Sequence, residues 1–174
     1  MVRCPPNLCP PLISPILSCY RQYRYETLLA TNADLKAELL LMDDVASQHL
    51  KTYQVWHHRR LLIQHLKTAR PELAFIASIL EHDAKNYHTW SYRQWLLAHF
   101  NDDSLWAGEL PYVEEMLSND LRNNSAWHHR FFVVWGSGVR QGDENRQDTL
   151  RRELKYVFYV HLLQSHPDSY AIAL

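Results

Sequence analysis

The sequence predicts an all-α protein, an α-α superhelix in which antiparallel helical hairpins stack into a solenoid. The decisive observation is a helix start that recurs around Trp56, Trp90 and Trp127, with an Arg three residues after each Trp. These tryptophans are 34 and 37 residues apart, which is typical of two-helix repeats. A single hairpin cannot bury its apolar face alone, so repeats of this length are expected to stack.

The composition supports helices that are packed by large side chains. The 174 residues include 6 Trp and 10 Tyr but only 4 Gly. Aromatic side chains bury much apolar area, and a chain with few glycines has few tight turns. The length suits one repeat-built domain with a substantial core.

The charge balance and the cysteines exclude several classes of protein. With 18 basic and 19 acidic residues, the net charge of −1 gives no basic surface for nucleic acid. The only cysteines, Cys4, Cys9 and Cys19, precede the repeats, so no disulfide framework is expected and we predict a cytoplasmic protein. No stretch approaches the roughly 20 apolar residues of a membrane span, so no stable membrane insertion is expected.

Two parts of the chain differ in composition. Residues 1–19 contain five prolines and are predicted to form a disordered or extended tail. Residues 20–174 are predicted to form helical-hairpin repeats. The last unit is expected to be incomplete, because Asp168 to Ala171 starts a repeat that has no Trp.

Helices are expected in the parts of this second region where apolar residues recur with helical spacing. The expected segments are 20–29, 35–46, 52–66, 71–80, 86–100, a helix from about 108, 125–135 and 147–165. Pro111 is compatible with helix only in a first turn, where its missing N–H has no helical partner. Residues 136–138 and 141–143 are predicted to form a flexible loop.

The repeated Trp-x-x-Arg motif is interpreted as a packing device. Residues three apart share one face of a helix. Each indole is expected to fill the gap between neighbouring hairpins, while each Arg pairs with a carboxylate or a helix C-terminus. A catalytic group is needed once, whereas a packing device is needed in every repeat. This structural role is assigned to Trp56, Arg59, Trp90, Arg93, Trp127 and Arg130.

The polar residues that precede the tryptophans are not the same in all three repeats, and they are candidates for a binding site. They are Lys51, Tyr53, Asn86, Tyr87 and His88. Helix N-termini attract anions, and Lys, Tyr and His side chains add hydrogen-bond donors. Such a group suits a phosphate or a diphosphate. The alternative is that Tyr and Asn serve as ordinary helix caps and staples.

No metal site is predicted in this chain. The adjacent pairs His57-His58 and His128-His129 point about 100° apart on a helix and cannot chelate one ion together. No His-Glu-x-x-His motif is present.

The segments from Tyr53 to Arg60 and from Asn86 to Trp95 resemble the α-subunit repeats of protein farnesyltransferase and protein geranylgeranyltransferase type I. The resemblance covers about residues 20–167 and is strongest over 51–133. It departs from the family pattern at Arg21, where a Trp is expected, and at Thr52, where an Asn is expected. It implies a right-handed, crescent-shaped solenoid that wraps a separate β subunit.

The resemblance also implies that the α and β subunits have different roles. The β subunit holds the catalytic Zn²⁺ and the isoprenoid tunnel, Mg²⁺ accompanies the diphosphate in the farnesyltransferase form, and the α chain binds no cofactor itself. Lys51 is expected to face the diphosphate, and Tyr53 and Tyr87 to lie near the active site. Lys51 and Tyr87 are the predicted catalytic residues. Asn86 and His88 are expected to line the same interface.

The predicted function is therefore that of an α subunit in a heterodimeric prenyltransferase. The enzyme would transfer a farnesyl or geranylgeranyl group from its diphosphate to the Cys of a C-terminal CaaX motif. Two alternatives remain: a non-catalytic helical scaffold that binds proteins, and the α subunit of the Rab-modifying geranylgeranyltransferase.

Overall fold

A computed structural model of the protein describes residues 13–141 and 146–165, with side chains at 21–136, 147–160 and 162. The described residues form nine α-helices and no strand, which confirms the all-α prediction. By its contacts the chain divides into two compact units, residues 1–129 and 130–174, and each unit is described by itself.

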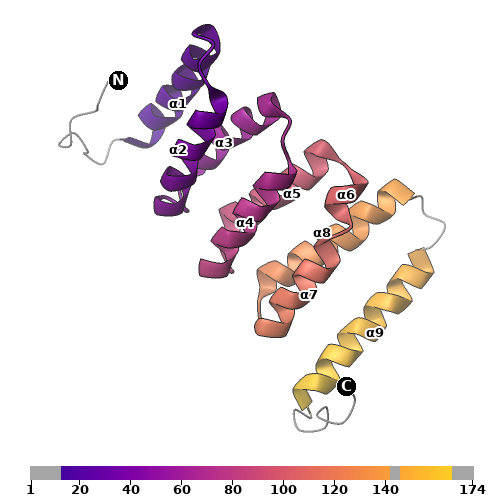
Figure 1. The fold of residues 1–174 in the computed structure, drawn as a ribbon. Helices are drawn as coiled ribbons and strands as arrows, with labels where there is room; N and C mark the ends of the chain where they lie inside the picture. The colour runs from indigo at the N-terminus through magenta and orange to yellow at the C-terminus, as the bar shows by residue number, and fades with distance from the viewer. Residues whose placement is uncertain (1–12, 142–145, 166–174) are drawn as a thin grey trace. The chain divides into compact units, whose positions relative to one another are not determined.

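The helices follow one another with short connections (Figure 1). They are α1 (Ile13–Ala30), α2 (Leu35–Gln48), α3 (Tyr53–Leu66), α4 (Arg70–His82), α5 (Tyr87–Phe100), α6 (Asp103–Trp106), α7 (Glu109–Asn119), α8 (Asn124–Gln141) and α9 (Arg146–Ser165).

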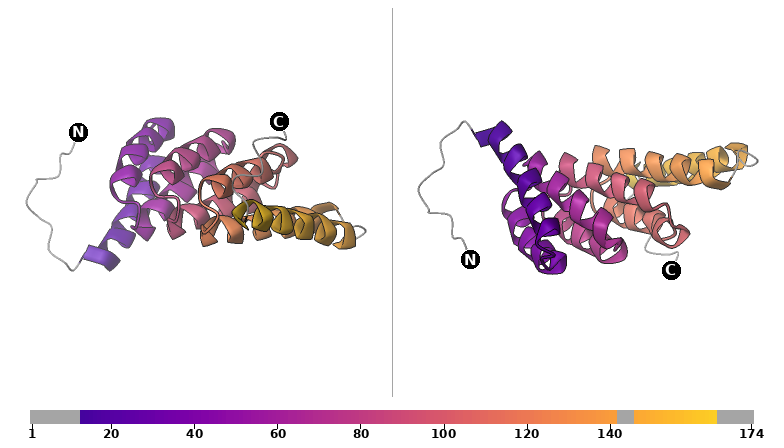
Figure 2. Two further views of the ribbon diagram at one scale, coloured as in Figure 1. Left: turned by 90° about the horizontal axis from the view of Figure 1, so that it is seen from below. Right: turned by 90° about the horizontal axis from the view of Figure 1, so that it is seen from above.

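Packing in the first unit follows chain order. Helix α3 packs against α1 and α2, helix α5 packs against α4 and α3, and α6 packs against α7. In both views of Figure 2 the colour also runs in chain order along this unit, so helices that are close in sequence are close in space. This arrangement is the one expected for stacked two-helix repeats.

A continuous apolar core lies between α2 and α3. Leu35, Met42 and Ala46 of α2 form one buried cluster with Val55 and Leu62 of α3. Burying one such aliphatic side chain contributes about 1.5–3 kcal/mol. The helical spacing of these residues in the sequence is therefore the main determinant of how the two helices pair.

The first two Trp helices end in the same way. Lys67 follows the last residue of α3 and Asn101 follows the last residue of α5, and both adopt the left-handed conformation with φ of 53° and 47°. A left-handed residue after the last turn lets its N–H bond back to a helix carbonyl, here those of Ile63 and Leu97. The two helices thereby end at the same position of the repeat.

The predicted start of the first helix is wrong. Helix α1 begins at Ile13 rather than at residue 20, so the tail predicted for residues 1–19 is helical from Ile13. Pro15 lies in the first turn of α1, where a proline removes no helical hydrogen bond. The rest of the predicted tail, and the predicted repeat start from Asp168 to Ala171, lie outside the described residues.

The loop predicted at Gly136 is also wrong, because α8 continues through Gly136 and Gly138 to Gln141. A glycine within a helix costs about 1 kcal/mol relative to alanine, and this local preference does not stop a helix that packing supports. Gly142 lies outside the described residues. Pro111 does lie in the first turn of α7, as predicted, while the short α6 was not predicted.

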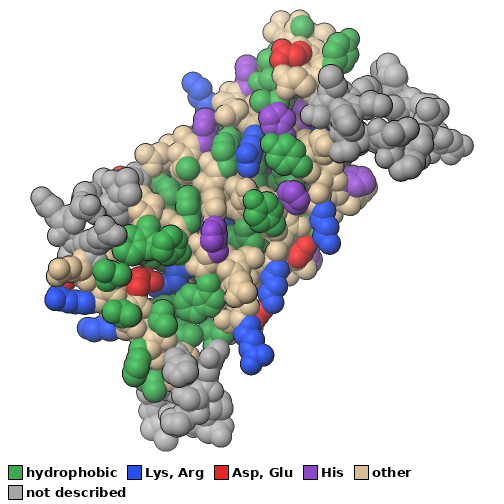
Figure 3. All heavy atoms as spheres, turned by 180° about the vertical axis from the view of Figure 1, so that it is seen from behind, with side chains coloured by type: hydrophobic (Ala, Val, Ile, Leu, Met, Phe, Trp, Pro, Cys, Tyr) green, Lys and Arg blue, Asp and Glu red, His purple; other side chains and the backbone are tan. Residues whose placement is uncertain are grey.

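The surface carries large apolar side chains beside charged ones. Figure 3, seen from behind Figure 1, shows many hydrophobic side chains on that face, with Lys and Arg side chains at several of its edges. In the first unit the exposed large hydrophobic residues are Tyr23, Leu40, Leu41, Tyr53 and Tyr87.

Candidate functional site

Each Trp helix begins with the same hydrogen bond. The indole Nε1–H donates to the carbonyl of the residue six positions earlier, which lies in the turn before the Trp helix. The bonds are Trp56 to Leu50 at 2.8 Å, Trp90 to Ala84 at 2.9 Å and Trp127 to Leu121 at 2.8 Å. The Trp therefore fixes the turn that leads into its own helix, and the residues between turn and Trp are held in one geometry.

The Arg of each motif forms a bidentate ion pair with a Glu of the following helix, as the packing interpretation predicted. The pairs are Arg59 with Glu72, Arg93 with Glu109 and Arg130 with Glu153. Arg24 pairs with Glu38 in the same way, although Arg21 stands where the other repeats have Trp. The ion pair is thus retained even in the repeat that lacks the indole.

The same Glu also binds the next repeat. The residue two positions after each Trp contacts the Glu of the helix that precedes its own Trp helix. These contacts are His58 Nε2 to Glu38 at 3.0 Å, Tyr92 Oη to Glu72 at 2.7 Å and His129 Nε2 to Glu109 at 2.8 Å. Burial lowers the pKa of His129, so its neutral imidazole donates the Nε2–H to Glu109. We call this Arg–Glu–His/Tyr series the polar ladder.

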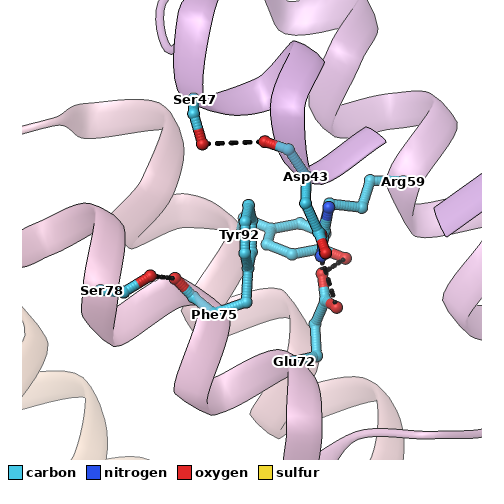
Figure 4. Close-up of polar contacts among 7 residues, drawn as sticks. All are labelled: Asp43, Ser47, Arg59, Glu72, Phe75, Ser78 and Tyr92. Atoms are coloured by element: carbon cyan, nitrogen blue, oxygen red, sulfur yellow. Dashed lines mark hydrogen bonds and ion pairs between the residues drawn. The ribbon is translucent and has the colours of Figure 1, made fainter. Parts of the chain in front are cut away.

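Figure 4 shows the ladder at Arg59. The guanidinium contacts Glu72 through two nitrogens and Asp43 at 2.6 Å, and it lies 3.6 Å above the ring centroid of Phe75. Tyr92 donates to Glu72 from α5. One carboxylate thereby joins α3, α4 and α5.

Two of the ladder carboxylates, Glu38 and Glu109, have a lowered pKa in the folded chain. Burial alone would raise the pKa of Glu38, but hydrogen bonds from His58 and Arg24 lower it to about 2. The pKa of Glu109 is lowered by the same kinds of donor against the effect of burial. Burial and the nearby Glu72 raise the pKa of Tyr92 well above its ordinary value. Groups that are buried and bonded in this way suit a structural role and are poor acids or bases.

The N-terminal halves of successive Trp helices lie side by side. Trp56 of α3 contacts Tyr92 of α5 with ring centroids 5.2 Å apart, and Trp90 of α5 contacts His129 at 4.8 Å. The Asn123 amide donates to the carbonyl of Ala84 at 3.0 Å, which joins the turns before α8 and α5. Residues at the starts of α3, α5 and α8 therefore share one rim of the first unit.

Three of the predicted site residues are exposed on this rim. Lys51 precedes α3, Tyr53 is the first residue of α3 and Tyr87 is the first residue of α5; the tyrosines are 58% and 76% exposed. Lys51 forms no ion pair with any described residue, whereas Lys85, at the same position of the next repeat, pairs with Asp120 at 2.9 Å. Neither Lys51 nor Tyr53 makes a hydrogen bond or ring contact with Tyr87 in the described part of the chain.

Asn86 has a different environment from the one expected of a diphosphate ligand. It is buried, its Oδ1 accepts a hydrogen bond from the Thr89 backbone N–H at 3.1 Å, and its Nδ2 donates to Asp83 at 3.1 Å. This is the N-cap of α5. His88 is half-buried and lies edge-on to Tyr87 at 5.7 Å.

A pocket of about 400 Å³ lies between the starts of α5 and α8. It is lined by Tyr87, Trp90, Ser91, Gln94, Asn124, Ser125 and His128. Gln94 Nε2 lies 3.2 Å from His128 Nδ1 across it. Of the residues predicted to meet the diphosphate, Tyr87 lines this pocket, and Lys51 and Tyr53 lie outside its lining.

The described residues show no group of three or more His, Cys, Asp or Glu that could hold a metal ion. No helix in the described ranges is both long and apolar enough to cross a membrane.

The ladder glutamates were not predicted, although the sequence carries a signal for them. Helices α2, α4, α7 and α9 each contain Glu followed by Leu, at Glu38, Glu72, Glu109 and Glu153. In the last three an aromatic residue follows the Glu at the third position and stacks on the paired Arg. A search for the partner of each repeated Arg would have found this motif.

Comparison with known proteins identifies the origin of the repeats. The sequence matches the protein prenyltransferase alpha subunit repeat at residues 35–66, 70–100 and 106–135, which together are more than half of the chain. The chain belongs to this family. Each matched segment holds one Glu-Leu helix followed by one Trp helix.

The family assignment agrees with similar curated proteins. The chain is 27% identical over 157 residues to the geranylgeranyl transferase type-2 subunit alpha of Saccharomyces cerevisiae, covering 83% of this chain and 48% of that protein. It is 38% identical over 64 residues to the protein farnesyltransferase/geranylgeranyltransferase type-1 subunit alpha of Pisum sativum, covering 37% of this chain and 18% of that protein.

A solved structure of the Candida albicans protein geranylgeranyltransferase-I complexed with GGPP is also similar. It has a TM-score of 0.71 and 33% sequence identity, and the match covers 89% of this chain and 52% of that one. The α-α superhelix predicted from the sequence is the fold of that neighbour. The chain spans about half the length of the relatives that it matches over most of its residues.

Proposed function

We propose that this chain acts as the α subunit of a heterodimeric protein farnesyltransferase or geranylgeranyltransferase type I in the cytoplasm. The observation that carries the proposal is the contrast between the buried, mutually bonded residues of the repeat motif and the exposed polar residues at the starts of the Trp helices. The repeated Trp, Arg and Glu residues are mostly buried and bonded to each other. Lys51, Tyr53 and Tyr87 do not take part in these contacts, and they present an ammonium and two phenols on one rim.

The proposed chemistry uses these donors on a leaving diphosphate. A cysteine thiolate of the CaaX substrate attacks C1 of the isoprenoid while the C1–O bond breaks, and the departing diphosphate takes the bonding electron pair. Lys51 and Tyr87 would stabilise the growing negative charge, with Tyr53 beside them. Donors that bind the transition state more strongly than the ground state raise the rate.

The metals of this reaction are assigned to other components of the enzyme. Zn²⁺ in the β subunit would supply an activated thiolate, and Mg²⁺ would screen the diphosphate charge in the farnesyltransferase form. The described residues of this chain supply hydrogen bonds and positive charge.

Three neighbours of the phenols, His57, Asn86 and His88, are assigned positioning roles. His57 stacks on Tyr53 with ring centroids 6.1 Å apart and planes 14° apart. Asn86 caps the helix whose first residue is Tyr87, so the cap sets where that phenol projects. His88 contacts the Tyr87 ring from the side. A fixed donor needs little reorganisation when charge develops, which is the condition for effective electrostatic stabilisation.

The test is turnover by the heterodimer after co-expression with a farnesyltransferase β subunit, with a CaaX peptide and farnesyl or geranylgeranyl diphosphate. Lys51→Ala should lower the single-turnover rate by about 10²–10³, the usual cost of removing one such donor. Co-purification with the β subunit should be unchanged. Lys85→Ala is the matched control, because its exposed pair with Asp120 is expected to contribute little. An unchanged rate in Lys51→Ala would remove Lys51 from the catalytic group.

A Rab-type geranylgeranyltransferase α subunit is the second candidate. It is favoured by the match to the yeast type-2 subunit, which covers 83% of this chain. Co-expression with each type of β subunit distinguishes the two, because the β subunit that co-purifies identifies the enzyme. A chain that co-purifies with neither would instead fit the non-catalytic scaffold.

A further inference from the structure

One arginine of α3 has no carboxylate partner among the described residues. Arg60 follows Arg59 directly, but only Arg59 is bonded to Glu72 and Asp43. The Nε of Arg60 is buried and has no hydrogen-bond partner in the described part of the chain. Neither α3 nor α5 contains an Asp or a Glu, so these two helices supply no anion for Arg60.

Two aromatic side chains of α5 hold the Arg60 guanidinium in place. Its Cζ lies 5.9 Å from the ring centroid of Tyr92 and 5.2 Å from that of Trp95. Tyr92 is buried and stacks on Trp95 with ring centroids 5.4 Å apart, and Trp95 stacks on His99 at 5.1 Å. A cation over an aromatic face is attracted to the ring. The guanidinium is therefore positioned before any anion reaches it.

The cation at this position is not part of the repeat. The residue four positions after the Trp is Arg60 in α3, Gln94 in α5 and Phe131 in α8. The Arg three positions after the Trp is present in all three helices and pairs with a Glu of the following helix. Stacking of the repeats thus requires the second kind of arginine but does not require Arg60.

Arg60 lies on the same stripe of α3 as the exposed Tyr53. His57 and Arg60 follow Tyr53 by four and seven positions, a spacing that places all three on one side of a helix. Seven residues advance about 10 Å along a helix axis. All three side chains are exposed or half-buried. A partner that approaches the rim at Tyr53 therefore also meets Arg60, at a separate point.

We propose that Arg60 binds a carboxylate side chain of the β subunit and thereby contributes to assembly of the heterodimer. This inference rests on the proposed function, because it takes the β subunit as the partner. A planar guanidinium binds a carboxylate through two parallel N–H bonds. Here the two terminal nitrogens make them, since Nε is buried. Arg, Trp and Tyr are enriched among the residues that dominate the binding energy of interfaces.

The test measures dissociation of the heterodimer. The α chain is labelled with fluorescein and co-purified with a farnesyltransferase β subunit, and fluorescence anisotropy is followed as the complex is diluted. Arg60→Gln, which has the amide that α5 carries at Gln94, should weaken the Kd at least about tenfold. Arg60→Lys keeps the charge and should weaken it less. Arg70→Gln is the matched control at an exposed Arg of α4, and its Kd should equal that of the parent.

Salt and turnover provide two further measurements. The Kd of the parent should rise with salt more steeply than that of Arg60→Gln, because salt screens an ion pair that only the parent forms. At concentrations that keep the heterodimer assembled, Arg60→Gln should react at the parental single-turnover rate. This pattern is the reverse of that expected for Lys51→Ala, which assembles normally and reacts slowly.

The outcomes separate this inference from the proposed function. If the parent heterodimer assembles and turns over, and Arg60→Gln has the same Kd, the role of Arg60 is overturned and the proposed function stands. Equal weakening by Arg60→Gln and Arg60→Lys would also overturn it, because the partner would then not recognise the charge. A parent chain that does not co-purify with the β subunit would overturn both. Far-UV circular dichroism establishes that the variants are folded.

Discussion

At the level of single residues, the glutamates of the polar ladder connect neighbouring helices. Glu72 accepts from Arg59 of the helix before it and from Tyr92 of the helix after it. Buried ion pairs often contribute little net stability, because desolvation offsets the Coulombic attraction. A carboxylate that must meet donors from two other helices nevertheless fixes their relative register. We therefore interpret the polar ladder as the feature that selects one stacking geometry.

The lowered pKa of Glu38 makes the ladder sensitive to acid. Its pKa falls from an ordinary value of 4.5 to about 2 in the folded chain, so the folded state favours the ionised form. The resulting stability is fully present above pH 4.5 and is lost as the pH falls toward 2. We expect Glu38→Gln to be less stable than the parent at neutral pH, with a difference that shrinks across this window. Urea unfolding as a function of pH measures it.

Glu81→Gln is the control for that experiment, because Glu81 is exposed and lies outside the ladder. It should follow the parent at every pH. A constant difference between Glu38→Gln and the parent from pH 7 to pH 2 would show that the Glu38 carboxylate does not contribute through its charge.

At the level of helices, the sequence predicts most elements because their apolar residues recur with helical spacing. The errors occur where local signals oppose packing. The glycines at 136 and 138 suggested a loop, but α8 continues through them, and the proline at 15 suggested a tail, but it fits the first turn of α1. Lys51, Tyr53 and Tyr87 could be named from the sequence because they are hydrogen-bond donors placed at the start of a helix, where an anion is favoured. The buried cap made by Asn86 could not, since an Asn before a helix also suits an anion site.

The cap of α5 provides a test at this level. Asn86→Ala removes the acceptor for the Thr89 N–H and the donor to Asp83, and a lost N-cap costs about 0.5–2 kcal/mol. We expect a lower free energy of unfolding in urea, without loss of the fold. Asn124→Ala is the matched control, because Asn124 is exposed at the start of α8 and forms no cap bond in the described residues. Equal stability of the two variants would contradict the assignment of Asn86 as a cap.

At the level of the whole molecule, repeat architecture makes stability a local property. Each helix is stabilised chiefly by its neighbours, so a repeat with an uncovered face is expected to open more easily than one covered on both sides. Helix α5 has neighbours through α3, α4 and the ring contact between Trp90 and His129. Helix α9 instead exposes Leu154 and Phe158. The division into two compact units is consistent with such local differences.

Hydrogen exchange provides the corresponding prediction. Backbone amides of α9 should exchange faster than those of α5, because opening α9 gives up less buried apolar contact. Mass spectrometry of exchanged, digested protein measures both helices in one sample. Protection of α9 equal to that of α5 in the free chain would mean that the α9 face is already covered, and the contrast between covered and uncovered repeats would then have no energetic consequence.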